Sequence, residues 1–289
     1  MATEIFFNSG YDHIFRDICS RLTSHELLRL SATCKILHGR VIESEWDLDR
    51  SLLEFTPNPS ELRHIMRNCD AVISGCFALR FLARGSRNVG NLALYVQRSE
   101  RTDELRRFFL REGYHQGTTI TEKGYYDLVK LERNSDSNLP PTVVSFISTN
   151  NLPVDFIIQN SYSTAIVNFI FAGRAVSVYP KVTFDTHGDV QLRVQIPNHK
   201  PSFSALLEYH RRGWPLVPFD ESVGCLGQIR SFGDRYCWTL PLSQEGICTR
   251  NSFDILRYST LKRFVICDYL VMYIRGRYKP DPNWLCRYF

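Results

Sequence analysis

The side chains of this chain that could ligate a metal or act as a nucleophile are its histidines and cysteines, but their spacing supports neither role. The eight histidines form no HxH or HxxxH pair and the nine cysteines form no CxxC pair, although such spacings are typical of metal and redox sites. The sequence also contains no GxSxG, Walker or GxGxxG motif. We therefore expect no metal, no cofactor and no standard catalytic motif.

The composition indicates a folded protein with one large domain and a small appendage. Its 289 residues are 44% hydrophobic and 13% aromatic, which is enough to bury a large core. Several cysteines lie among apolar neighbours, as in residues 72–79 and 264–270, which is typical of reduced core cysteines in a reducing compartment. The sequence has neither an apolar run of about 18 residues nor a basic start before an apolar run. We therefore expect no membrane span, no secretory signal and a cytoplasmic or nuclear location.

The charge pattern favours no class of partner. The net charge is +5, and acidic and basic residues alternate along most of the chain. The densest positive stretch contains Arg80, Arg84 and Arg87, and a solvated charged loop is the common explanation of such spacing. Nucleic acid is therefore an unlikely partner.

Helical patterns dominate the first 50 residues. Ile14, Ile18 and Leu22 recur every four residues, as on one face of a helix. Residues 23–26 match a capping box, in which Thr23 accepts from the Glu26 amide while the Glu26 side chain reaches back. A second helix is predicted from there, and its apolar positions form one continuous stripe: Leu27, Leu30, Cys34, Leu37 and Val41. Helices this short cannot bury their own apolar face.

Residues 12–41, DHIFRDICSRLTSHELLRLSATCKILHGRV, resemble the F-box. The resemblance implies that residues 10–50 form a small helical segment that lays apolar side chains into the groove of a Skp-type adaptor of a cullin ubiquitin ligase. The side chains that it implies for this contact are Ile14, Ile18, Leu22, Leu27, Leu28, Leu30 and Cys34. Alternatively, the same residues simply cap the core of the main domain.

The rest of the chain predicts a mixed-sheet α/β domain over residues 60–289, which makes the whole fold α+β. Two prolines and a serine within residues 55–60 indicate the boundary. Helices are predicted over 61–68, 77–83, 103–112 and 161–171, strands over 71–75, 91–96, 142–149 and 152–159, and a hairpin over 118–133. Beyond residue 183 the patterns assign no topology, so additional C-terminal elements are expected there.

Residues 71–96, AVISGCFALRFLARGSRNVGNLALYV, resemble the nucleotidyltransferase signature. In that signature a strand ends in Gly-Ser, a helix follows, and the next strand carries Asp-x-Asp. The same block and the later pieces FLREGY, VDFII, VNFIFAGRAVSVYP and GDRYCW are also similar to fungal F-box-like proteins with a C-terminal degenerate domain of this kind. The active family needs paired carboxylates at i and i+2, which share one face of a strand and hold Mg²⁺, and a third carboxylate from a neighbouring strand.

Two of those carboxylates are absent from this sequence. The paired positions hold Asn91 and Ala93, and the third corresponds to Asp155. Asparagine offers only a neutral oxygen and alanine offers no ligand atom. Gly75-Cys76 replaces Gly-Ser, and a thiol is a weaker partner for phosphate than a hydroxyl. The resemblance therefore implies a degenerate nucleotide site, without metal-dependent transfer, at Gly75, Cys76, Asn91, Ala93 and Asp155.

Taken together, the two resemblances imply a non-catalytic recognition subunit, an F-box-type adaptor or substrate receptor that holds a protein substrate. Two alternatives stay open. The chain is a residual nucleotide-binding or nucleotidyltransferase enzyme centred on Gly75, Cys76 and Asp155, or it is a structural fusion of both modules without adaptor binding.

Overall fold

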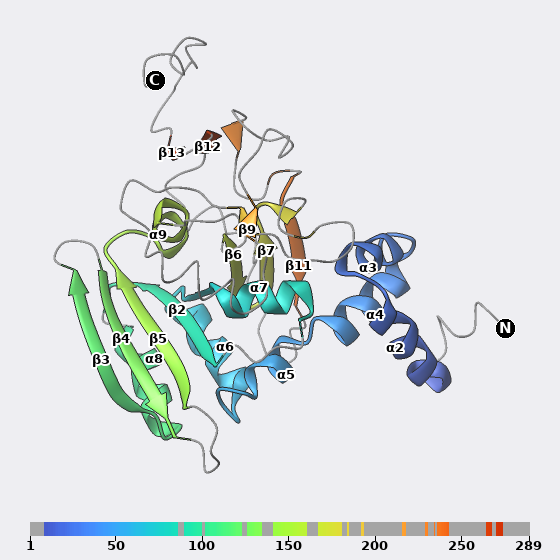
Figure 1. Cartoon of the computed structure of the whole chain (residues 1–289). Helices are drawn as coiled ribbons and strands as arrows, with labels where there is room; N and C mark the ends of the chain where they lie inside the picture. The colour runs from blue at the N-terminus through green and yellow to red at the C-terminus, as the bar shows by residue number, and fades with distance from the viewer. Residues whose placement is uncertain are drawn as a thin grey trace, which may run out of the picture.

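A computed structural model of the chain has an α+β fold, in which N-terminal helices precede an eight-stranded mixed sheet with further helices between its strands (Figure 1). This is the predicted fold class. The structure describes residues 9–85, 90–99, 102–122, 126–134, 141–160 and 167–180, followed by the short stretches 184, 192–193, 216–217, 229–230, 234, 236–242, 264–267 and 270–273.

The N-terminal helices form a lobe beside the sheet (Figure 1). A 3₁₀ turn, η1 (Ser9–Tyr11), precedes α2 (Asp12–Arg21), α3 (Ser24–Ser31) and α4 (Lys35–Glu45). We call α2, α3 and α4 the lobe. The short helix α5 (Leu48–Leu52) leads from the lobe to the sheet. The predicted capping box is confirmed, because the Glu26 amide donates to Thr23 Oγ1 at 3.2 Å and the Thr23 amide donates to Glu26 Oε2 at 2.8 Å.

The prediction of one continuous helix after the capping box is wrong, since α3 ends at Ser31 and α4 begins at Lys35. The hydroxyls of Ser31 and Thr33 donate back to the carbonyls of Leu28 and Leu30, at 2.8 and 2.7 Å. Cys34 is then extended, and its Sγ accepts from the Leu37 amide as the cap of α4. Such hydrogen bonds from side chains to nearby backbone groups compete with the backbone hydrogen bonds of a helix, and here they separate α3 from α4.

The strand and helix predictions for residues 61–112 are confirmed to within one or two residues. The elements are α6 (Pro59–Asn68), β1 (Val72–Ser74), α7 (Cys76–Ala83), β2 (Asn91–Gln97) and α8 (Thr102–Arg111). On β2, Leu92, Leu94 and Val96 are buried while the residues between them are partly exposed. This alternation is the one expected of a half-buried strand.

The predicted hairpin and the strand after it are also confirmed. β3 (His115–Glu122) pairs with β4 (Tyr126–Arg133), and β4 pairs with β5 (Thr142–Thr149), both antiparallel. β5 then lies parallel to β2. The parallel pair within an otherwise antiparallel sheet makes the sheet mixed. The full order is β11-β7-β6-β1-β2-β5-β4-β3.

Two predicted elements are wrong. Residues 152–159 were predicted as a strand, but Pro153–Asn160 is the helix α9, which starts with a proline as many helices do. Residues 161–171 were predicted as a helix, but Asn168–Phe171 is the strand β6. β6 forms a hairpin with β7 (Arg174–Ser177), and it is a central strand. A continuous apolar run fits a buried strand as well as a buried helix.

The C-terminal part of the predicted domain lies largely outside the described residues. In its described stretches, β11 (Trp238–Pro241) pairs with β7 at the edge of the main sheet. The remaining strands form two small sheets and are β8 (Leu192–Arg193), β9 (Leu216–Val217), β10 (Ile229–Arg230), β12 (Phe264–Cys267) and β13 (Leu270–Tyr273).

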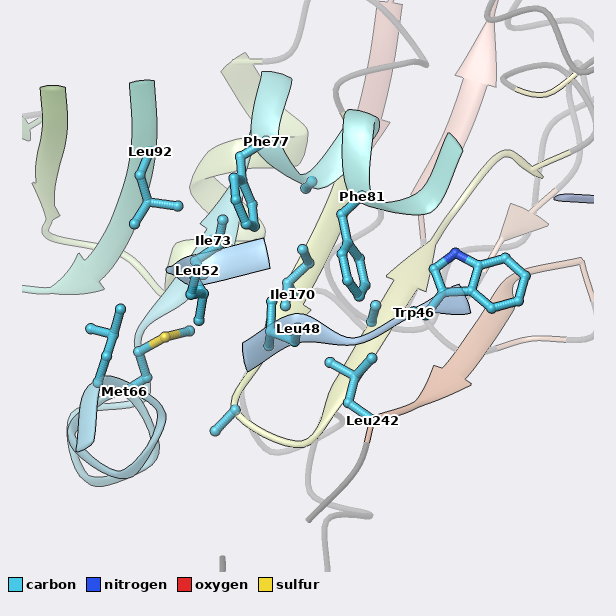
Figure 2. Close-up of a cluster of buried hydrophobic side chains, with 14 of the residues drawn as sticks. Trp46, Leu48, Leu52, Met66, Ile73, Phe77, Phe81, Leu92, Ile170 and Leu242 are labelled. Carbon is cyan, nitrogen blue, oxygen red and sulfur yellow. The ribbon is translucent and has the colours of Figure 1, made fainter. Parts of the chain in front are cut away.

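Hydrophobic side chains are buried on both faces of the sheet. The larger core gathers side chains from the N-terminal helices, α6, α7, α8 and one face of the sheet, and Figure 2 shows part of it around Phe77 and Phe81. A smaller core lies between α9 and the other face. Phe55, in the predicted boundary segment, is fully buried and packs edge to face on Phe77 at 5.6 Å. Residues on both sides of that segment therefore share one core.

Candidate functional site

The structure divides the seven predicted partner-binding side chains of the lobe between core and surface. Leu27 is fully buried, so it is not offered to a partner. Leu22, Leu28, Leu30 and Cys34 are partly exposed and pack against the larger core. Ile14 and Ile18 are likewise partly exposed, and they lie one helical turn apart on α2.

Further apolar surface on the lobe was not part of the sequence prediction. Ile36, in the first turn of α4, is 60% exposed, and Tyr11, just before α2, is 37% exposed. The sequence does carry a signal for the exposure of Ile36. This residue precedes Leu37, which belongs to the predicted apolar stripe, and does not itself belong to the stripe. We call Tyr11, Ile14, Ile18 and Ile36 the apolar lobe residues.

The helices of the lobe are held together by their own contacts. Arg40 of α4 forms an ion pair with Asp12 at the start of α2, and its guanidinium lies 4.2 Å from the ring centroid of Phe15.

Cys19 of α2 is fully buried. Burial, together with the nearby Glu45 carboxylate, raises the pKa of the Cys19 thiol to about 11. This thiol is therefore protonated at neutral pH and is a poor nucleophile.

The second predicted site lies where β1 turns into α7. Gly75 precedes α7 with φ 76° and ψ −146°, a conformation that glycine adopts at no steric cost. Ser74 of β1 lies opposite Ala93 of β2, and a Cβ at Gly75 would lie 4.0 Å from the Cβ of Ala93. The fold therefore brings together Gly75 and Ala93, with Cys76 as the first residue of α7.

The two β2 positions of the degenerate site face a neighbouring strand without an acid. Asn91 and Ala93 share one face of β2, and Ser145 of β5 lies opposite Ala93. The Ser145 hydroxyl donates to Asn91 Oδ1 at 2.9 Å. The amide oxygen of Asn91 is thus already bonded within the protein.

Asp155 does not lie on a strand, which corrects the prediction of a third carboxylate from a neighbouring strand. It belongs to the first turn of α9 and is 1% exposed. The neighbouring parallel strand is β5, with the sequence TVVSFIST, which contains no acid. The sequence misled here because residues 154–158 are apolar apart from Asp155, and such a run predicts no unique element.

Aromatic side chains lie beside the degenerate site. The ring of Phe156 on α9 lies 6.2 Å from that of Tyr95 and 5.5 Å from that of Tyr126. Burial, together with the nearby Cys76 and Tyr126, raises the pKa of the Tyr95 phenol to about 12. Tyr95 is therefore a neutral hydroxyl at physiological pH and carries no charge for metal or phosphate chemistry.

The part of the chain that the structure describes contains no metal cluster. Within those residues, no group of three or more histidine, cysteine or acidic side chains could hold a metal ion. No helix in the same residues is both long and apolar enough to cross a membrane. No protein-family model, curated protein or solved structure matches this chain.

Proposed function

We propose that this protein is a non-catalytic recognition subunit that docks a Skp-type adaptor of a cullin ubiquitin ligase through its N-terminal lobe. The observation that carries the proposal is that the lobe leaves apolar side chains exposed, in part at Ile14 and Ile18 on α2 and to 60% at Ile36 on α4. It lies within a segment whose sequence resembles the F-box. Exposed apolar side chains on short helices are the kind that fill an apolar groove.

The degenerate nucleotide site supports the non-catalytic part of the proposal. Asn91 and Ala93 occupy the positions at which the nucleotidyltransferase family needs its paired carboxylates, and Asn91 Oδ1 is bonded to Ser145. Holding a divalent cation between phosphates requires several anionic oxygens. In our proposal the sheet domain serves as the surface that holds a protein substrate.

Co-expression with a Skp-type adaptor, followed by size-exclusion chromatography, tests the docking. We expect the wild-type protein to elute with the adaptor and the Ile14→Asp/Ile18→Asp variant to elute alone, because a charge in an apolar groove lacks compensation. Leu53→Asp is the matched control, since Leu53 is 56% exposed but follows α5 and lies outside the lobe. Co-elution of the α2 variant, or no complex with the wild type, would contradict the docking proposal.

A residual nucleotide-binding function is the second candidate, and the Gly75 turn favours it. A strand, a positive-φ glycine and a helix follow one another there as in the signature that the sequence resembles. A ligand that binds only the folded state raises the melting temperature. Our proposal predicts no change in melting temperature with Mg²⁺ and ATP, whereas a rise that grows with ATP concentration would support nucleotide binding.

A further inference from the structure

The lobe meets α7 at the C-terminal end of that helix, where polar contacts accompany the packing of the shared hydrophobic core. The carbonyl of Leu82, in the last turn of α7, accepts from Ser24 Oγ of α3 at 3.2 Å and from Trp46 Nε1 at 3.4 Å. A helix leaves its last carbonyls without partners in the helix. A side chain of the lobe and the Trp46 ring that follows it therefore supply hydrogen-bond donors to a carbonyl at the C-terminal end of α7.

Arg84 makes the reciprocal contacts from α7 to the end of α2. Its Nη1 donates to the carbonyl of Leu22 at 2.7 Å and its Nη2 to the carbonyl of Cys19 at 3.0 Å. The same guanidinium forms an ion pair with Glu45, and both side chains are largely buried, with 15% and 11% exposed. The guanidinium fork suits several acceptors at once, and a cation is favoured at a helix C-terminus.

The backbone of Arg84 adds a second, independent observation. It lies in the left-handed region with φ 57° and ψ 31° as the C-cap of α7, although Gly85 follows it directly. Glycine is the usual residue in this conformation, which is unfavourable for a residue with a Cβ. A non-glycine residue persists there when its surroundings hold it. Here the surroundings are the two carbonyls of α2 and the Glu45 carboxylate.

We infer that Arg84 is a positioning residue that fixes the lobe on α7, so that the apolar lobe residues and the sheet keep one relative orientation. The chain is also attached where it leaves α4, at Trp46, whose ring packs edge to face on Trp238 at 5.4 Å. For recognition, a fixed orientation would hold an adaptor and a substrate at a defined angle, and this use rests on the proposed function.

Hydrogen exchange of the full chain without any adaptor tests the role of Arg84. We expect Arg84→Gly to speed exchange by about tenfold or more at the amides of α2 and α3, while amides of β2 and β5 exchange as in the wild type. Arg80→Ala is the matched control, because Arg80 lies one turn earlier on α7 and pairs with Glu54 outside the lobe. It should leave exchange in α2 and α3 unchanged.

Arg84→Gly separates the side chain from the backbone, because glycine relieves the left-handed conformation while it removes the guanidinium. If Arg84 served only as a helix cap, this variant would exchange like the wild type or more slowly. Unchanged exchange in α2 and α3, or an equal increase throughout the sheet, would overturn the positioning role. Because no adaptor is present, this outcome is distinct from a failure of adaptor binding, which the chromatography of the wild type reports.

Discussion

The lobe and the Gly75 turn are the two regions in which the sequence predicted binding. They differ in which side chains they leave available to a partner. At the turn, Ser145 bonds Asn91, and the Ser74 hydroxyl donates to the Asn168 carbonyl at 2.8 Å. These polar groups have partners inside the protein. Polar groups of the lobe also form hydrogen bonds within the protein, but apolar side chains such as Ile36 stay exposed.

This difference identifies the lobe as the better candidate for a partner. A polar group that is already bonded must give up its partner to bind a ligand, and the net gain is small. An exposed apolar side chain gains free energy as soon as it is covered. Substitutions in both regions test this difference.

The largest effect is expected on α7, which follows the Gly75 turn and contacts the lobe. Phe77 is fully buried in the core that Figure 2 shows, and its ring packs on that of Phe55. We expect Phe77→Ala to lower the free energy of unfolding by about 3–5 kcal/mol, since it removes a buried ring and leaves a cavity. Urea denaturation measures the loss, and Leu53→Ala, at an exposed position, should change it by about 0.5 kcal/mol or less.

A pair of substitutions in the lobe tests the division between core and surface. Leu27 is fully buried and Ile18 is partly exposed. We expect Leu27→Ala to cost about 2–5 kcal/mol of unfolding free energy, and Ile18→Ala to cost clearly less because it removes less buried area. Denaturation of the two variants under the same conditions gives the comparison. Equal losses would show that Ile18 belongs to the core and is not available to a partner.

The start of α3 should show a smaller effect. Thr23 caps this helix through its hydroxyl, which accepts from the Glu26 amide at 3.2 Å. We expect Thr23→Ala to cost about 1 kcal/mol of unfolding free energy, while Thr23→Ser, which keeps the acceptor, should cost less. Thermal or urea denaturation of both variants measures this difference, and equal losses would argue against the cap.

At the degenerate site, Ser145→Ala should cost about 0.5–1.5 kcal/mol of unfolding free energy. The substitution removes one hydrogen bond, to Asn91 Oδ1, and this hydrogen bond joins two neutral groups. The variant should also bind Mg²⁺ and ATP no better than the wild type in a thermal-shift measurement. A gain of nucleotide binding would mean that the Ser145 bond masks a functional site, and the comparison with the lobe would fail.

The smallest effect is a pH dependence at Glu26. Hydrogen bonds from the Thr23 amide and hydroxyl lower the pKa of the Glu26 carboxyl in the folded protein. Its contribution to stability is therefore present above its unfolded pKa of about 4.3 and is lost as the pH falls through the lower folded pKa. We expect the melting temperatures of wild type and Glu26→Ala to converge on acidification. The difference in melting temperature between Glu26→Gln and Glu26→Ala should not change over the same pH range, because neither variant carries the carboxyl.

Local signals account for what the sequence predicted correctly. Thr23 and Glu26 fixed the start of α3, Gly75 separated a strand from a helix, and Leu92, Leu94 and Val96 identified a half-buried strand. The misses arose where burial removes the pattern. β6 and α9 are apolar runs that fit a strand as well as a helix, so the sequence could not place Asp155 on a helix. For Leu27 the sequence left two places open, a partner surface and the core. The contacts of Arg84 join residues 39 to 65 positions apart, a separation at which local patterns carry no information.

Calorimetric titration of purified adaptor into the full chain measures whether the apolar lobe residues bind a Skp-type adaptor, as we propose. We expect saturable binding by the wild type and an affinity at least about tenfold weaker for Ile18→Asp, a loss of about 1.4 kcal/mol or more. Leu53→Asp should bind like the wild type. Equal affinity of the wild type and Ile18→Asp, or no binding by the wild type, would contradict the claim.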